Sequence, residues 1–180
     1  MKIMNKFQKK LANRKKDNKG FSLVELIIVI AIMAILVGIV GTQVIPYISK
    51  SKVAKDQQVL NSISTAAVTA YSENAEKITD STAITIDNVF GTEANDPKKS
   101  LVDSIQEASG FKSSGSGASA VSALDSFKKA LAADGKDKIT AVKVTYDQVN
   151  HKVTTEVVYS IDPEDPEYPK YPIQKVEATL

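Results

Sequence analysis

The sequence predicts an α+β protein in which a long N-terminal α-helix packs on a small C-terminal antiparallel β-sheet. An apolar stretch at residues 21–45 runs directly into a segment with helical periodicity that ends near residue 74. Between residues 142 and 161, apolar residues recur at every second position, which is typical of half-buried strands. At 180 residues, the chain is long enough to bury the core of one domain.

The charge of the chain is distributed unevenly. Residues 1–20 contain eight basic residues and one acid, whereas residues 21–180 contain 15 basic and 20 acidic residues. A basic block ahead of an apolar run is typical of a membrane-insertion segment, and its positive flank tends to stay cytoplasmic. The acidic remainder argues against nucleic acid as a main partner, because phosphate binding needs clustered lysine and arginine. The chain has no cysteine, so disulfides and thiolate chemistry are excluded.

The apolar stretch is long enough to cross a membrane as a helix. Leu26–Gly41 is an uninterrupted apolar run of 16 residues. At about 1.5 Å per residue, residues 21–45 span roughly 37 Å, against a hydrocarbon core of about 30 Å. The 25 residues from Phe21 to Ile45 are interrupted only by Ser22, Glu25, Thr42 and Gln43.

The start of this stretch has a specific pattern. The change from polar to apolar sequence is sharp at Gly20-Phe21, Glu25 follows shortly afterwards, and no convincing signal-peptidase site of small residues follows the run. Together with the basic leader, this pattern resembles the leader and N-terminal helix of type IV prepilins and the related pseudopilins, over about residues 15 to 70. The resemblance implies a pilin-like fold with a cleaved leader at residues 1–20, a transmembrane and filament-core helix at residues 21–46, and a soluble head domain at residues 47–180.

The resemblance also implies roles for three residues. A prepilin peptidase would cut after Gly20, the last leader residue, and Phe21 would become the N-methylated first residue of the mature chain. Glu25 would then pair with the Phe21 amine of a neighbouring subunit, because an unpaired charge in a low-dielectric filament core is strongly unfavourable. Alternatively, Glu25 lies at the membrane interface near the helix N-terminus, where the helix dipole favours a carboxylate.

The sequence departs from the family near the end of the apolar stretch. Relatives often carry proline at the position of Thr42, whereas here the proline comes one helical turn later, at Pro46. Proline removes a backbone donor, and Gly38 and Gly41 weaken the helix just before it. We therefore expect a kink or a locally melted segment in this region.

The helical pattern continues beyond Pro46, so the sequence predicts one continuous helix from about Ser22 to about Asn74. Lys55, Asp56, Gln57 and Gln58 fall between the members of its apolar stripe. The stripe consists of Val53, Leu60, Ile63, Ala67 and Ala70.

Shorter elements follow. Residues 82–90 alternate weakly, which indicates a strand or an edge segment. Asp96 and Pro97 are predicted to be the N-cap and first residue of a short helix that Gly110 closes. Residues 113–117 form a flexible connector, and a second short helix carries the stripe Val121, Leu124, Phe127 and Leu131 and ends at Gly135.

An antiparallel hairpin is predicted from residues 142–146 and 153–161, joined by a turn at residues 147–151, and residues 172–180 can add a final strand. His151 is the only histidine and falls in the turn, so we expect it to be exposed to solvent. A single imidazole without cysteine cannot build the usual zinc site. Because no nucleophile-elbow, P-loop or dinucleotide-binding motif occurs, neither enzymatic activity nor a cofactor is expected.

Four prolines at an interval of three, Pro163, Pro166, Pro169 and Pro172, predict a polyproline II turn within a rigid surface loop that joins two strands. The loop could instead bind another subunit or a surface ligand. A third interpretation is a calcium site, as in acidic loops of some pseudopilins, although the spacing matches no EF-hand. Its candidate ligands are Asp162, Glu164, Asp165 and Glu167.

The function implied by the resemblance is that of a structural subunit of an extracellular type IV pilus, with roles such as adhesion, surface motility or DNA uptake. Its partners would be further copies of the chain in a helical filament, other pilins, a prepilin peptidase, an assembly ATPase and a membrane platform. The chain would be a single-pass protein of the cytoplasmic membrane, with a cytoplasmic N-terminus, before assembly. Two alternatives are a minor pilin or pseudopilin of a secretion or competence system, and a single-pass anchored binding protein that never polymerises.

Overall fold

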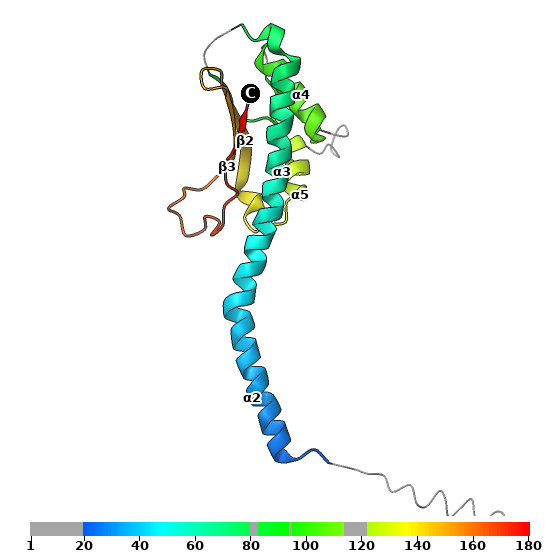
Figure 1. The fold of residues 1–180 in the computed structure, drawn as a ribbon, viewed down its shortest axis with the longest axis vertical. Coiled ribbons are helices and arrows are strands. Elements are labelled where there is room, and N and C mark those ends of the chain that lie inside the picture. Colours follow the sequence, from blue (N-terminus) through cyan, green and yellow to red (C-terminus); the bar gives the residue numbers. More distant parts are fainter. Residues whose placement is uncertain (1–19, 80–82, 94, 114–121) are drawn as a thin grey trace, which may run out of the picture. The chain divides into compact units, whose positions relative to one another are not determined.

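A computed structural model describes residues 20–79, 83–93, 95–113 and 122–180 of the chain (Figure 1). These residues form two units, the first of which ends at Val44 and the second of which comprises Ile45–Leu180. Parts of four predicted features lie outside the described residues: the leader up to residue 19, residue 82 of the edge segment, residues 114–117 of the connector, and Val121 of the second short helix.

The first unit is a helix whose apolar side chains are exposed. It consists of α2 (Leu23–Ile39) and the π-helical turn η1 (Val40–Val44). No residue of α2 is buried, and large apolar side chains such as Leu36 and Val37 are 55% and 71% exposed. The helical residues continue without a gap to Glu73, and the helix is long and apolar enough to cross a membrane.

The irregularity expected near Pro46 takes the form of η1. Proline has no N–H, so the ordinary ladder of helical hydrogen bonds cannot continue unchanged across Pro46. The hydroxyl of Thr42 donates to the carbonyl of Gly38 at 3.0 Å, which gives this carbonyl a side-chain partner within the turn. The sequence therefore located the irregular segment, but the structure shows a π turn and not a melted helix.

In the second unit, α3 (Ile45–Glu73) packs against β3 and β4 (Figure 1). Four members of its predicted stripe, Leu60, Ile63, Ala67 and Ala70, are fully buried, whereas Val53 is half-buried. A short 3-10 helix, η2 (Ala75–Lys77), follows α3.

Within the described part of the chain, four antiparallel strands form a sheet in the order β1-β2-β3-β4. The predicted hairpin, β2 (Ile139–Asp147) and β3 (Lys152–Tyr159), forms its centre. The predicted edge segment is β1 (Ile84–Ile86), and the predicted final strand is β4 (Val176–Thr179). The side chains that alternate toward the helices are fully buried in the core; they include Val142, Val144, Tyr146 and Val153.

The helix α4 (Lys98–Ser109) begins one residue later than predicted. Pro97 occupies the N-cap position in place of Asp96, although the Asp96 carboxylate still accepts a hydrogen bond from the backbone N–H of Ser100 at 3.3 Å. Gly110 ends the helix in the left-handed conformation, with φ of 77°, as predicted.

The helix α5 (Ala123–Ala130) ends well before Gly135, so that part of the prediction is wrong. At Leu131 the backbone becomes extended, with ψ of 145°. The next two residues then donate their backbone N–H groups to Asp56 of α3, which the helix would not allow. Gly135 instead precedes the 3-10 helix η4 (Lys136–Lys138) with φ of 88°.

The proline-rich segment joins β3 to β4, as predicted, but two linked β-turns replace polyproline II in its first half. The N–H of Asp165 donates to the carbonyl of Asp162, and the N–H of Tyr168 donates to the carbonyl of Asp165, both at 2.9 Å. Polyproline II has no such internal hydrogen bonds. Pro163 and Pro166 each follow the first residue of a turn, where the fixed φ of proline is favourable.

Candidate functional site

The predicted processing site lies at the exposed start of α2. Gly20 and Phe21 immediately precede the helix cap, and the Phe21 side chain is 86% exposed. A methyl group added at Gly20 would meet no atom within 4 Å. Among the described residues, nothing crowds this position.

Glu25 lies one helical turn into α2 and caps the helix. Its Oε2 accepts a hydrogen bond from the backbone N–H of Ser22 at 2.9 Å, while Ser22 Oγ accepts one from the N–H of Val24 at 3.4 Å. This reciprocal pattern is a capping box. The carboxylate therefore satisfies a backbone donor at the start of its own helix, where the helix dipole also favours a negative charge.

The capping geometry also brings the carboxylate close to the predicted cleavage point. Ser22, whose N–H it binds, follows Phe21 directly, so cleavage after Gly20 would create a positive amine one residue away from that N–H. The three predicted residues are therefore brought together within one short segment. The Glu25 carboxylate therefore lies near the position where cleavage would create the positive amine of Phe21.

Sequence reasoning missed a buried carboxylate in the second unit. Asp56 is fully buried and accepts hydrogen bonds from the backbone N–H groups of Ala132 at 2.8 Å and Ala133 at 2.7 Å. Its position carried a signal, since residue 56 lies three residues after Val53 and four before Leu60, which is within the apolar stripe. A polar residue on such a stripe indicates a specific buried partner.

Gln57, the residue after Asp56, binds the chain just beyond the last proline of the proline-rich segment. Gln57 donates its amide to the carbonyl of Gln174 at 2.9 Å and accepts from the N–H of Gln174 at 3.0 Å. Two adjacent side chains of α3 therefore hold two distant segments, 76 and 117 residues further along the chain. They tie distant segments of the chain together, which disulfide cross-links do in many small secreted domains.

The four candidate calcium ligands are not brought together as a coordinating set. The side chains of Asp162 and Asp165 accept hydrogen bonds from the N–H groups of Glu164 and Glu167, respectively, at 2.9 and 2.8 Å. Glu167 itself pairs with Lys138 at 2.8 Å, and this hydrogen bond raises the pKa of Lys138. Across the described ranges, no group of three or more histidine, cysteine or acidic side chains is placed to hold a metal ion.

His151 lies in the turn between β2 and β3 and is exposed, as predicted. Its φ of 48° is in the left-handed region, which is typical of a tight turn. It contributes to the shape of the hairpin, and its imidazole is far along the chain from the helix start that carries the processing motif.

Comparison with known proteins identifies the same N-terminal segment. Residues 15–41 match the family described as the prokaryotic N-terminal methylation motif. No curated protein and no solved structure matches the chain. The matched residues include Gly20, Phe21, Glu25 and the whole of the exposed helix α2. The match supports a pilin-like protein, whose N-terminal segment carries the methylation motif of prokaryotic type IV prepilins.

Proposed function

We propose that the chain is a structural subunit of an extracellular type IV pilus, processed by a prepilin peptidase and polymerised through its N-terminal helix. The observation that carries this proposal is the methylation motif at residues 15–41, which includes the helix α2, a helix with no buried residue. A helix that is apolar on all sides needs an apolar environment. The bilayer supplies it before assembly, and the helices of neighbouring subunits supply it in the filament.

The division of labour along the chain follows from this function. Residues 1–20 are a leader that is removed, residues 21–46 form the membrane and filament-core helix, and residues 47–180 form the soluble head. The head faces the extracellular side, since the basic leader favours a cytoplasmic N-terminus. Further copies of the chain and other pilins are the assembly partners, and the ATPase and membrane platform act indirectly.

Glu25 sets the axial register between subunits in this proposal. Cleavage after Gly20 frees a positive amine on Phe21, and burial of this amine among apolar helices is unfavourable unless a negative group pairs with it. Glu25 of a neighbouring subunit supplies that group. The capping hydrogen bond to Ser22 holds the carboxylate near the helix start until a neighbour arrives.

The capping box permits an experiment that separates charge from helix capping. Glu25→Gln keeps a side chain that can accept the Ser22 N–H but removes the charge, whereas Ser22→Ala weakens the cap and keeps the charge. We expect Glu25→Gln to insert into the membrane normally and to yield few or no filaments sheared from cells, because the Phe21 amine loses its partner.

Ser22→Ala is the matched control and should still assemble, since loss of a cap costs only about 1 kcal/mol. Normal filaments from Glu25→Gln would contradict the pairing. The abundance of the wild-type chain in the same sheared fraction distinguishes a major pilin from a minor pilin or pseudopilin, which would be scarce there.

A further inference from the structure

Tyrosine and lysine side chains gather where α3 begins. The ammonium group of Lys50 lies 5.4 Å from the centre of the Tyr171 ring, and that of Lys170 lies 5.8 Å from it. Tyr47, one turn before Lys50, is 75% exposed. We call these four residues the basal surface. Its Tyr171 ring brings two positive charges from distant parts of the chain together.

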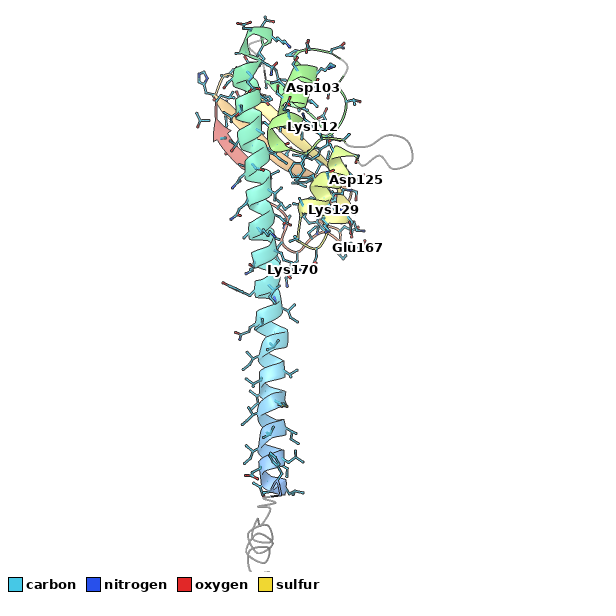
Figure 2. The ribbon with its side chains drawn as sticks, turned by 90° about the vertical axis from the view of Figure 1, so that its right-hand side faces the viewer. Asp103, Lys112, Asp125, Lys129, Glu167 and Lys170 are labelled. Atoms are coloured by element: carbon cyan, nitrogen blue, oxygen red, sulfur yellow. The ribbon has the colours of Figure 1, made fainter. Side chains whose placement is uncertain are left out.

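An open groove of about 330 Å³ adjoins the basal surface. The first turns of α3 contribute Ile45 and Val53 to its lining, and the proline-rich segment contributes Pro169, Lys170 and Tyr171. Figure 2 shows Glu167 and Lys170 together at this end of the second unit. The groove thus combines an apolar lining with a basic rim.

Two lysines of the basal surface lack ion-pair partners, whereas the acids that line the groove are paired. The two acids that line the groove are each neutralised by a lysine: Asp134 by Lys52 at 3.4 Å and Glu167 by Lys138 at 2.8 Å. Among the residues that the structure describes, neither Lys50 nor Lys170 has an acidic partner within ion-pair distance. The ammonium groups of Lys50 and Lys170 are therefore available to an anion, and the acids Asp162, Glu164 and Asp165 lie earlier in the proline-rich segment, outside the lining of the groove.

The position of Tyr47 and Lys50 along the chain indicates which anions lie within their reach. A bilayer core takes about 20 helical residues, which counted from Leu23 reaches about residue 42. Tyr47 and Lys50 follow within two further turns, so they fall at the level of the lipid headgroups. This placement depends only on distance along the chain and holds for any angle between the two units.

We propose that the basal surface binds anionic phospholipid headgroups of the outer leaflet of the membrane. Lys50 and Lys170 contact the phosphates, and the amphipathic rings of Tyr47 and Tyr171 lie at the interface, where tyrosine is favoured. The bound headgroups hold the second unit against the membrane surface while the apolar helix is embedded. This binding requires a membrane-embedded chain but no polymerisation, so it stands or falls independently of the proposed pilus function.

The absence of tryptophan from the sequence allows a direct test. Tyr171→Trp places the single tryptophan of the chain in the basal surface, where it can be excited selectively, and keeps an aromatic ring beside both lysines. The membrane-extracted variant is reconstituted into vesicles of phosphatidylcholine, with or without phosphatidylglycerol, that carry a quencher attached at the headgroup. We expect phosphatidylglycerol to shift the emission to shorter wavelength and to increase quenching, and we expect high salt to reverse both effects.

Charge variants in the same background measure the contribution of each lysine. A lysine near an anionic surface adds about a five-fold preference for the bound state, so Lys50→Gln and Lys170→Gln should each reduce the ratio of bound to free head by about that factor. Lys129→Gln on α5 is the matched control, because this lysine is exposed and lies outside the basal surface, and it should leave the ratio unchanged. Val149→Trp, in the exposed hairpin turn, controls for quenching that arises from tethering alone.

Equal emission and equal quenching in the two kinds of vesicle would overturn the proposal. It would also be overturned if quenching followed the density of protein in the vesicle and ignored lipid composition, since that result would assign the basal surface to a second copy of the chain.

Discussion

Asp56 is the residue on which the packing of α3 against the segment after α5 depends. Asp56→Ala would leave the N–H groups of Ala132 and Ala133 without their acceptor in a largely buried environment. We expect the free energy of unfolding to fall by about 3 kcal/mol, since each orphaned buried donor costs about 1–3 kcal/mol. Urea unfolding of the detergent-solubilised chain, followed by near-UV circular dichroism of tyrosine, measures this change.

The tyrosine signal reports on the second unit alone, because the first of the six tyrosines in the sequence is residue 47. Asp137→Ala provides the control, since Asp137 is exposed and should contribute less than about 0.5 kcal/mol. Equal losses of unfolding free energy in the two variants would contradict the proposed contribution of the Asp56 hydrogen bonds to stability.

Tyr146 couples the stability of the core to alkaline pH. Its ring is fully buried and its hydroxyl donates to the carbonyl of Ala67 at 3.0 Å, and burial raises the pKa of Tyr146 above the ordinary 10.0. The folded protein therefore keeps this proton at a pH where the unfolded chain loses it. The contribution to stability is complete below about pH 10 and is lost as the pH rises beyond it.

Tyr146→Phe removes the titrating group but keeps the ring that stacks on Tyr71. The variant should lose about 1 kcal/mol of stability at neutral pH and should show a smaller decline of stability above pH 10 than the wild-type chain. Urea midpoints measured across the alkaline range give both quantities. Parallel pH curves for the two proteins would show that another group controls the alkaline transition.

At the scale of elements, a glycine fixes how the proline-rich segment lies against η4. Gly135 and Gly110 both have positive φ, but a methyl group at Gly135 would lie 2.7 Å from Pro169 Cγ, whereas one at Gly110 would meet nothing within 4 Å. Gly110→Ala should cost about 1 kcal/mol for the left-handed backbone alone. Gly135→Ala should cost about 2–4 kcal/mol, because the overpacking against Pro169 is added.

The difference between the two alanine variants isolates the contact with Pro169, and the same unfolding measurement detects it. Pro169→Gly combined with Gly135→Ala should recover most of that difference. Equal costs at the two glycines, or no recovery in the double variant, would mean that the segment is not held at this point.

The elements themselves could be predicted because their patterns are local. The hairpin, the edge strand and the stripe of α3 follow from apolar periods of two and of three to four, which short windows of sequence contain. Their ends depend on residues elsewhere: α5 ends where it does because Asp56, about 75 residues earlier in the chain, takes the next two N–H groups. No pattern within α5 encodes that partner.

The proline-rich segment shows a different limit. An interval of three residues fits both polyproline II and tandem β-turns, so the interval alone could not decide between them. The deciding signal is the aspartate before Pro163 and Pro166, whose side chain accepts a backbone N–H two residues on. The two Asp-Pro pairs, which favour turns, could have been recognised from the sequence, but the prediction relied on the spacing of the prolines alone.

At the scale of the whole molecule, the two candidate surfaces differ in how far the sequence reveals them. The processing motif is contiguous, so Gly20, Phe21 and Glu25 could be named from the sequence alone. The basal surface joins Lys50 to residues some 120 positions later, and only the folded second unit brings them together. Contiguous sites can be read from a chain, whereas composite sites need its fold.

The intact mass of the protein extracted from its native membrane tests the central claim most directly, because filament assembly through Glu25 requires a free amine on Phe21. We expect a chain that lacks residues 1–20 and carries one additional methyl group. This result would support the pilin and exclude a passive anchor that retains its leader. A mass that corresponds to the full chain from Met1 would contradict processing, the charge pairing of Glu25 and the pilus function together.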